Sequence, residues 1–324
     1  MMKAIVRDVY GPPDVLDFRD VEKPVPGLGE ALVRVEVASV NTADLEHLRG
    51  EPRAARVATG WRRPRSKGVG FDVAGRVESV GDDVRSLQPG DAVWADLFDS
   101  GGGAFAEYVS VPQEKLAPIP PGLSSEVAAT VPHSGLLALQ GLTGWGPIEP
   151  GQTVLVIGAG GCVGPFAIQL AKAFGAEVTG VDHTGKLDLM CSAGADHVID
   201  YTIEDFAENG RRYDMILDIA TQRSILVCRR SLAPRGRHAL IARSLGGFFK
   251  AAVVGAGTSI AGSKRMGVFV WKPNNREDLG HLGRLLASGA ITPLIDRSYP
   301  LGETPAALRY VDEGHARGKV IITV

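Results

Sequence analysis

The chain has 324 residues, of which 44% are hydrophobic and 22% are charged, and its formal net charge is −2. This length suits two domains of ordinary size. The small net charge gives no electrostatic support for a nucleic-acid or anionic-membrane partner, and no apolar run is long enough to span a bilayer. Only three cysteines occur, widely spaced, so a disulfide framework is excluded and a cytoplasmic location is expected.

The first 120 residues are typical of a β-rich domain. Residues 31–40 (ALVRVEVASV) and 73–81 (VAGRVESVG) are rich in β-branched residues, and DAVWADL and FAEYVSV follow. Clusters of Gly and Pro separate these runs, which predicts strands joined by turns. After a proline-rich linker, Ser124 or Ser125 is the predicted N-cap of a helix.

From residue 151 the pattern changes to alternating strands and helices. Strands are predicted at TVLVIGA, EVTGVD, HVIDY, YDMILDIA and HALIA, with helices at CVGPFAIQLAKAFG, KLDLMCSAGA and RSILVCRRSLAPRG. Such alternation predicts an α/β fold whose doubly wound parallel sheet is covered by helices on both faces. EDLGHLGRLLASGAI is an amphipathic helix pattern. The closing KVIITV is a strand, which we expect to return to the sheet of the first domain.

The segment VLVIGAGGCVG joins a predicted strand to a predicted helix that begins near Cys162. Its spacing Ala159-x-Gly161-x-x-Gly164 is a variant of the dinucleotide fingerprint. Glycines permit a tight turn and a close backbone approach to a pyrophosphate, whose charge the helix N-terminus stabilises. Residues Ala159, Gly161, Cys162, Val163 and Gly164 are therefore predicted to bind a cofactor; the alternative is a purely structural turn.

Asp182 ends the second strand of this unit, at the distance from the turn that the motif requires. A carboxylate there would accept hydrogen bonds from a ribose 2′-hydroxyl and repel a 2′-phosphate, which favours NAD. Thr184 and Lys186 follow directly and could instead bind that phosphate, so the choice between NAD and NADP stays open. His183 is included in the predicted cofactor site. An N-cap for the next helix is the alternative role of Asp182.

Nearly the whole chain resembles the medium-chain dehydrogenase/reductase superfamily, in its zinc-independent quinone-oxidoreductase-like branch. The motifs are MKAIVRDVYGPPDVL, VASVNTADLEHLRG, GFDVAGRVESVG, GGAFAEYVSVP, LVIGAGGCVG, GADHVIDYT and GHARGKVIITV. The resemblance implies a GroES-like β domain of residues 1–122 and 291–324, which supplies the substrate and catalytic side, and a Rossmann dinucleotide-binding domain of residues 123–290. It also implies a homodimer that uses NAD(P)H.

The resemblance names Asn41 and His133 as candidate catalytic residues. The family's Asn faces the nicotinamide and substrate, whereas Asn41 could also be only a turn residue. His133 could protonate a reduced substrate, because an imidazole titrates near neutral pH; the alternative is a core histidine held by local hydrogen bonds. Asp44 is expected to pair with Arg49.

Further positions concern the cofactor. The resemblance places Tyr201 near the adenine end of the cofactor, with core packing as an equal alternative, and Ile241 lies at the end of the fifth strand. Three residues depart from the family pattern: Ala242 and Arg243 stand where relatives have two glycines, and Leu137 stands where relatives often have Thr. These departures make the adenosine half of the site better preserved than the redox half.

Zinc-dependent relatives place metal ligands where this chain has Asn41, Phe71-Asp72 and His133. A catalytic zinc needs three side-chain ligands, and Phe71 cannot coordinate a metal. We therefore expect no metal and no zinc. Asp72 is then expected to be a buried structural acid, paired with a cation near Arg49.

The expected function is hydride transfer from NAD(P)H to a quinone, an enone or a related activated C=C or carbonyl compound, a small-molecule substrate. Two alternatives remain. One is a metal-free alcohol or carbonyl dehydrogenase, which needs a proton donor such as His133. The other is a non-redox descendant of the fold that binds a nucleotide or metabolite without turnover.

Overall fold

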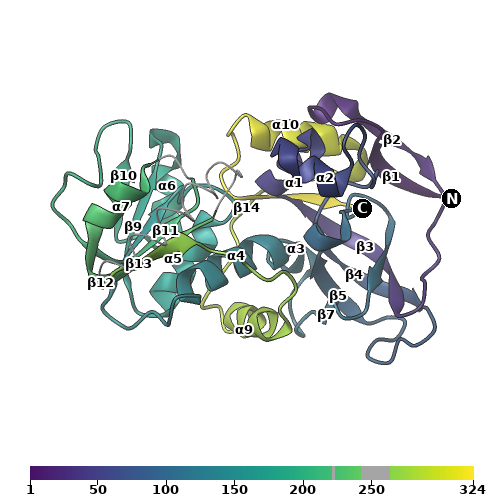
Figure 1. The fold of residues 1–324 in the computed structure, drawn as a ribbon. Helices are drawn as coiled ribbons and strands as arrows, with labels where there is room; N and C mark the ends of the chain where they lie inside the picture. Colours follow the sequence, from purple (N-terminus) through teal and green to yellow (C-terminus); the bar gives the residue numbers. More distant parts are fainter. Residues whose placement is uncertain (221–222, 242–262) are drawn as a thin grey trace. The chain divides into compact units, whose positions relative to one another are not determined.

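A computed structural model describes residues 1–220, 223–241 and 263–324, and contacts divide the chain into two compact units (Figure 1). The first unit contains Met1–His133, Pro273–Ala287 and Ile295–Val324, and the second contains Ser134–Lys272 and Ser288–Leu294. No described helix has the length and apolarity needed to cross a membrane. Ala242 and Arg243, which depart from the family pattern, lie outside the described residues.

The first unit is built on a sheet in the order β14-β15-β3-β4-β5-β7, with β6 also paired to β3. Its strands are β3 (Glu30–Val40), β4 (Asp72–Val80), β5 (Ala92–Asp96), β6 (Tyr108–Pro112), β7 (Ala117–Pro118), β14 (Ile295–Pro300) and β15 (Lys319–Thr323). A separate hairpin joins β1 (Met2–Arg7) to β2 (Leu16–Val21). Because β15 pairs with both β3 and β14, the predicted return of the C-terminal strand to the first sheet is confirmed.

Short helices accompany this sheet. They are α1 (Thr42–Arg49), α2 (Arg56–Thr59), α3 (Ser125–Ala129), α9 (Arg276–Ala287) and α10 (Thr304–Asp312), with 3₁₀ turns η1 (Pro13–Val15), η2 (Arg53–Ala55), η3 (Phe98–Ser100) and η5 (Leu301–Glu303). The predicted cap of the helix after the linker is Ser124, whose hydroxyl accepts from the Val127 N–H at 3.3 Å.

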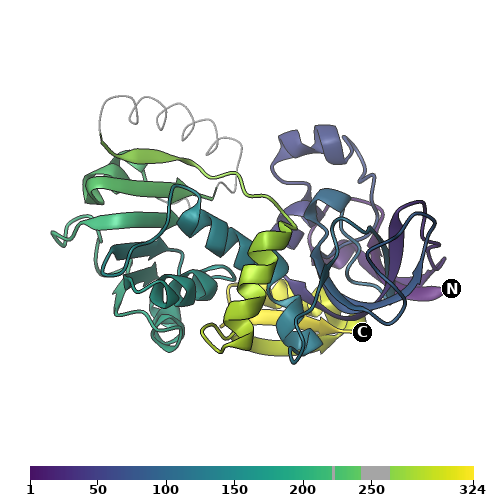
Figure 2. The ribbon, with the colours of Figure 1, turned by 90° about the horizontal axis from the view of Figure 1, so that it is seen from below.

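The second unit contains a fully parallel sheet in the order β10-β9-β8-β11-β12-β13 (Figure 2). The strands are β8 (Thr153–Ile157), β9 (Glu177–Asp182), β10 (His197–Asp200), β11 (Tyr213–Asp218), β12 (Leu232–Leu240) and β13 (Arg265–Val268). The described helices are α4 (Pro132–Thr143), α5 (Gly164–Ala173), α6 (Leu187–Ser192) and α7 (Ile225–Ser231), with the turn η4 (Thr184–Lys186). The strand order reverses between β8 and β11, the point at which such sheets bind ligands.

The predicted domain boundaries at 122/123 and 290/291 differ in detail from the unit boundaries. The structure groups α3 with the first unit, where it contacts β3 and β4, and it groups α9 there as well. As limits of independently folding domains, the predicted boundaries stay a prediction.

Candidate active site

The glycine-rich turn follows β8 at the carboxyl edge of the parallel sheet. Gly158 has φ +82°, a left-handed conformation that L side chains rarely adopt. A Cβ at Gly164 would lie 2.1 Å from the carbonyl oxygen of Ala159, so the first turn of α5 can rest on the loop only when Gly164 lacks a side chain. A Cβ at Gly161 would meet only the Gly158 oxygen, at 3.5 Å. The turn therefore combines close helix packing with an open backbone face at Gly161, as a pyrophosphate site requires.

The helix after the turn begins at Gly164, slightly later than the predicted start near Cys162. Residues 159–163 complete the turn, with Val163 at the N-cap and buried. Cys162 is partly exposed and has a free thiol. Both lie within the glycine-rich turn, and no side-chain cap of α5 is formed there.

Asp182 ends β9 and contacts the turn directly. Its Oδ2 accepts a 2.8 Å hydrogen bond from the Gly160 N–H, and its Oδ1 accepts one from the His183 N–H at 2.8 Å. His183, rather than Asp182, is the N-cap of η4, because its Nδ1 accepts from the Gly185 N–H at 3.1 Å. The alternative role of Asp182 as an N-cap is therefore wrong. Instead, its carboxylate holds the turn and lies where a ribose would be bound.

Other predicted cofactor residues surround Asp182 at the ends of β9 and β10. The Thr184 hydroxyl donates to Asp200, and the side chain of Lys186 lies against Gly160. Hydrogen bonds from Thr184 and from the Thr202 hydroxyl lower the pKa of Asp200 below its ordinary value. The second carboxylate therefore stays charged, which adds to the negative charge near Asp182.

Tyr201 follows β10, and its N–H donates to the Asp182 carbonyl at 3.1 Å. Its side chain is 43% exposed, so the alternative that it packs in the core is wrong. Ile241 follows β12, where its N–H donates to the Asp218 carbonyl at 2.9 Å. Leu137 on α4 is buried, with 6% of its surface exposed.

Asp72 is the centre of a buried polar cluster in the first unit. Its Oδ2 accepts hydrogen bonds from the Ser39 hydroxyl and the Asn41 amide, each at 2.8 Å, and its Oδ1 accepts from the His133 backbone N–H at 2.8 Å. The Lys319 ammonium lies 3.3 Å from Asp72 Oδ2 and donates to Asn41 Oδ1 at 2.6 Å. All five residues are at most 5% exposed. The carboxylate is thus satisfied by three donors and one cation.

The cation predicted for Asp72 is wrong. Arg49 forms its ion pair with Asp312, and the partner of Asp72 is Lys319 at the start of β15. The predicted pair of Asp44 with Arg49 is wrong for the same reason. Asp44 instead accepts the Asn41 N–H at 2.7 Å in a capping box at the start of α1.

Asn41 is more than a turn residue. It is the N-cap of α1, and its amide group bridges Lys319 and Asp72. Burial raises the pKa of the neighbouring Asp44 to about 7. The cluster therefore holds one carboxyl that titrates close to neutral pH.

His133 makes its own pair with a second buried carboxylate. Its Nδ1 lies 2.7 Å from Asp96 Oδ2, while Asp96 Oδ1 accepts the Phe98 N–H at 2.7 Å. The Asp96 backbone is held by Asn274, which both accepts its N–H and donates to its carbonyl. Burial lowers the pKa of His133, but the charge and hydrogen bond of Asp96, together with the charges of Asp72 and Asp44, raise it above its ordinary value of 6.5. The hydrogen bond with Asp96 fixes the position of the His133 imidazole, and the raised pKa favours its protonated form.

Aromatic rings enclose the imidazole. Phe71 stacks on His133 with ring centroids 6.2 Å apart, and Phe98 lies 5.9 Å from the same ring. Phe71 is fully buried. Both rings therefore pack near the imidazole. The role of His133 stays open between a histidine held by local bonds and a proton donor.

The residues at the zinc-ligand positions of the family fit a metal poorly. Asn41, Asp72 and His133 do come together, but the Lys319 ammonium already contacts Asn41 and Asp72. His133 Nδ1 is engaged by Asp96, and Phe71 offers no ligand atom. A zinc ion would have to displace a buried cation, so we derive no catalytic step through a metal.

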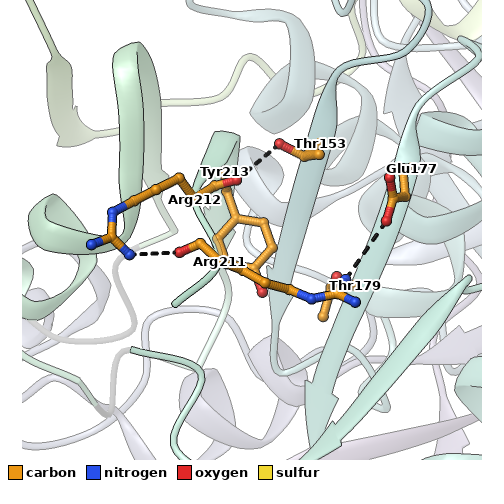
Figure 3. A pocket seen from close by; sticks show the side chains of 6 residues that line it. All are labelled: Thr153, Glu177, Thr179, Arg211, Arg212 and Tyr213. Carbon is orange, nitrogen blue, oxygen red and sulfur yellow. Dashed lines mark hydrogen bonds and ion pairs between the residues drawn. The ribbon is translucent and has the colours of Figure 1, made fainter. Parts of the chain in front are cut away.

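A surface pocket lies at the opposite edge of the parallel sheet (Figure 3). It is lined by Thr153, Glu177, Thr179, Arg211, Arg212 and Tyr213, most of them at the amino ends of β8, β9 and β11. Glu177 pairs with Arg211 and His197. Because ligands bind such sheets at the carboxyl ends of the strands, this pocket is not the nucleotide site.

Two functional residues, Asp96 and Lys319, were missed by sequence reasoning. Each lies at the end of a predicted strand, and the register that pairs Asp72 with Asp96 brings β4 and β5 together there. The available signal was a charged residue at the inner end of an otherwise apolar run: DAVWAD for Asp96 and KVIITV for Lys319.

Comparison with known proteins supports the same assignment for nearly the whole chain. Residues 27–121 match the family "Alcohol dehydrogenase GroES-like domain", and residues 193–322 match "Zinc-binding dehydrogenase". "Quinone-oxidoreductase QR1, chloroplastic" of Triphysaria versicolor is 30% identical over 99% of this chain and 98% of its own length. "NAD(P)H oxidoreductase RTN4IP1, mitochondrial" of Mus musculus is 32% identical over 100% of this chain and 89% of its own.

A solved structure agrees. The quinone oxidoreductase from Coxiella burnetii superposes with a TM-score of 0.88 at 28% identity and covers 100% of this chain and 99% of its own. The chain belongs to the medium-chain dehydrogenase/reductase superfamily, in its quinone-oxidoreductase-like branch. The predicted fold, a GroES-like domain combined with a Rossmann domain, is confirmed.

Proposed function

We propose that this chain is an NAD(P)H-dependent oxidoreductase that reduces a quinone or an enone without a catalytic metal, and that His133 supplies the proton. The observation that carries the proposal is the His133–Asp96 pair, a buried imidazole whose proton is stabilised by a carboxylate 2.7 Å away. Relatives with the printed names quinone oxidoreductase, NAD(P)H oxidoreductase and 2-methylene-furan-3-one reductase support the reaction class.

Bound NAD(P)H would supply the hydride. The turn from Gly158 to Gly164 would hold the pyrophosphate through its backbone N–H groups, and Asp182 would orient the adenosine ribose. These roles need no side-chain nucleophile. The protein would position the cofactor and the substrate and exclude water from them.

His133 would complete the reduction. When a hydride adds to the β-carbon of an enone, the C=C bond is lost and an enolate forms, which needs one proton to give the saturated ketone. Because Asp96 engages Nδ1, the proton would leave from Nε2 of His133. His133 and Leu137 are four residues apart on α4 and therefore lie on the same side of that helix. The resemblance places Leu137 beside the nicotinamide carboxamide, so this spacing supports a role near the reacting carbon.

The proposal is tested by turnover with a panel of quinones, enones, aldehydes and alcohols. We expect NADH or NADPH to be oxidised by quinones or enones, at a rate that added zinc does not raise. Turnover confined to alcohols and aldehydes would favour the alternative dehydrogenase. Tight nucleotide binding without turnover on any compound would favour the non-redox alternative.

The role of His133 has its own test. We expect His133→Asn to lower kcat for enones by roughly 100-fold, the usual contribution of a positioned acid, with little change in nucleotide affinity.

A pH profile gives a second test. The activity of the wild-type enzyme should fall as the pH rises through the raised pKa of His133. Asp96→Asn removes the charge that raises this pKa, so the fall should begin at lower pH. Asp99→Asn, an exposed acid paired with Lys115, is the control. An identical pH profile in Asp96→Asn would rule out this role.

We also propose that the protein is a cytoplasmic homodimer. Within the described residues β13 is one of the two edge strands of the parallel sheet, and the edge of a sheet is a common place for chains to pair. The three cysteines are free thiols, as in reducing compartments. Light scattering coupled to gel filtration should give twice the chain mass of 34.2 kDa; the mass of one chain would contradict the dimer.

A further inference from the structure

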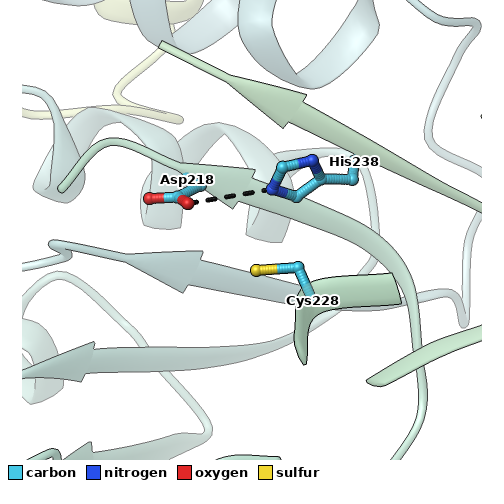
Figure 4. A group of neighbouring side chains, drawn as sticks. All are labelled: Asp218, Cys228 and His238. Atoms are coloured by element: carbon cyan, nitrogen blue, oxygen red, sulfur yellow. Dashed lines mark ion pairs between the residues drawn. The ribbon is translucent and has the colours of Figure 1, made fainter. Parts of the chain in front are cut away.

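Three side chains able to bind a metal meet inside the second unit, at the carboxyl edge of its sheet (Figure 4). They are Asp218 at the end of β11, Cys228 on α7 and His238 on β12. Each offers a ligand atom, and these atoms all lie within 4.8 Å of one another. The register explains the grouping, because His238 pairs with Ile216, two positions before Asp218, and alternate residues share a face of the sheet.

The cluster lies in the core, where its polar groups need partners. Asp218 and His238 are 1% exposed and Cys228 is fully buried, among apolar residues such as Ile216, Leu232 and Met266. Across the described parts of the chain, neither ring nitrogen of His238 has a hydrogen-bond partner. Its Nε2 is 3.8 Å from Asp218 Oδ2, too far for a hydrogen bond. A buried imidazole is costly when its nitrogens lack partners, and none of the described residues supplies one here. A bound metal ion would remove part of that cost.

The spacing and the chemistry both fit a tetrahedral ion. Zinc binds sulfur at about 2.3 Å and nitrogen or oxygen at about 2.0–2.2 Å, so neighbouring ligand atoms of a tetrahedron lie roughly 3.3–3.8 Å apart. Two nitrogen or oxygen ligands of one zinc ion lie roughly 3.3–3.6 Å apart. The 3.8 Å between Asp218 and His238 must therefore shorten by a few tenths of an ångström, and the Cys228 sulfur must also move closer. A thiolate, an imidazole and a carboxylate together suit zinc or cobalt rather than magnesium or calcium.

We propose that Asp218, Cys228 and His238 bind one zinc ion through three of its four coordination positions. This site is distinct from any metal at the catalytic residues of the family. On binding, the Cys228 thiol loses its proton to solvent and a sulfur–zinc bond forms. The charges of the thiolate and of the Asp218 carboxylate then neutralise the divalent ion. The neutral zinc site can be buried in an apolar core at a lower desolvation cost than a charged one. The ion would join β11, α7 and β12. Asp218 lies two residues before Ala220, whose side chain fills the space beside Gly158 in the nucleotide turn.

The test is metal content and spectroscopy of the full-length protein. We expect about one zinc per chain after equilibration with zinc and removal of the excess. Loading with cobalt(II) should give a thiolate-to-cobalt absorption band and the visible bands of a tetrahedral ion. Cys228→Ser, which keeps the size of the side chain, should lose the thiolate band and most of the metal. Cys191→Ser, at an exposed cysteine, should keep both.

A folded wild-type protein that takes up no zinc or cobalt would overturn the proposal, as would a Cys228→Ser variant that keeps a full equivalent. If Cys228→Ser does not fold, Asp218→Asn gives the same comparison, read as metal content and as the loss of the zinc-dependent rise in melting temperature. Neither result depends on turnover. The zinc site can therefore be disproved without affecting the proposed reaction, and the reaction can be disproved without affecting the zinc site.

Discussion

At the scale of single residues, Asp182 is the side chain that we expect to set the choice between NADH and NADPH. Its carboxylate touches Gly160, and the charge of Asp200 lies on the next strand in register with it. Two acids at this point disfavour the 2′-phosphate of NADPH, so we expect NADH to be preferred.

Replacement of Asp182 should change this preference. We expect Asp182→Ser to raise the ratio of NADPH to NADH efficiency by roughly tenfold, which corresponds to about 1.4 kcal/mol. The ratio is the relevant readout, because loss of the Gly160 contact should weaken both nucleotides. Asp188→Ser, in the first turn of α6, is the matched control. A wild-type preference for NADPH would show that Thr184 and Lys186 dominate instead.

A second residue-scale effect concerns Asp44. The unfolded chain releases this proton near the ordinary pKa of 3.8, whereas the folded protein holds it to about 7. Between these values the folded state binds more protons, so Asp44 should make the free energy of unfolding fall as the pH rises from about 4 to 7.

Asp44→Asn should remove this part of the pH dependence, because a neutral amide can still accept the Asn41 N–H. Urea unfolding across that pH range gives the measurement, with Asp14→Asn, whose side chain is exposed, as the control. If the free energy of unfolding of Asp44→Asn changes with pH as steeply as that of the wild type, the titration assigned to Asp44 is wrong.

At the scale of elements, two glycines of the turn after β8 are expected to have different roles, one in helix packing and one in nucleotide binding. A Cβ at Gly164 would press on the Ala159 carbonyl, while a Cβ at Gly161 would make only an ordinary contact with the Gly158 oxygen at 3.5 Å. We therefore expect Gly164→Ala to lower both stability and nucleotide affinity. Gly161→Ala should keep the melting temperature but lose at least tenfold in affinity, because the pyrophosphate needs that space. Thermal unfolding and nucleotide titration of both variants distinguish these outcomes; full affinity in Gly161→Ala would contradict the placement of the pyrophosphate.

Elements that depend on local patterns could be predicted from the sequence, and contacts that depend on register could not. The strand before Gly158, the helix after it and the strand that ends at Asp182 follow from hydrophobic runs and glycine spacing. By contrast, Lys319 reaches Asn41 from 278 residues away along the chain, and no local pattern encodes that distance. Arg49 is the nearest Lys or Arg in sequence to Asp44, but it forms its ion pair with Asp312 instead.

At the scale of the whole molecule, Lys319 joins the last strand of the chain to residues from its first third. It is 2% exposed and is the charge partner of the fully buried Asp72. Removal of one member of a buried pair leaves an uncompensated charge, which typically costs 3–5 kcal/mol. We expect Lys319→Met to destabilise the protein by about this amount.

The neutral double variant Lys319→Met with Asp72→Asn should recover part of that loss. The exposed pair of Lys67 with Asp8 provides the control, because Lys67→Met should cost about 0.5 kcal/mol or less. A cost for Lys319→Met no larger than this would show that the ammonium does not stabilise Asp72. Denaturant unfolding gives all three values.

The central claim is hydride transfer to an activated double bond, and isotope transfer tests it most directly. The protein is mixed with nicotinamide cofactor deuterated at C4 and an enone, and the product is analysed by mass spectrometry and NMR. We predict a saturated ketone with deuterium at the β-carbon and a solvent-derived proton at the α-carbon. Tight cofactor binding with no deuterium in the product of any enone, and with no oxidation of the cofactor by any quinone, would contradict the account.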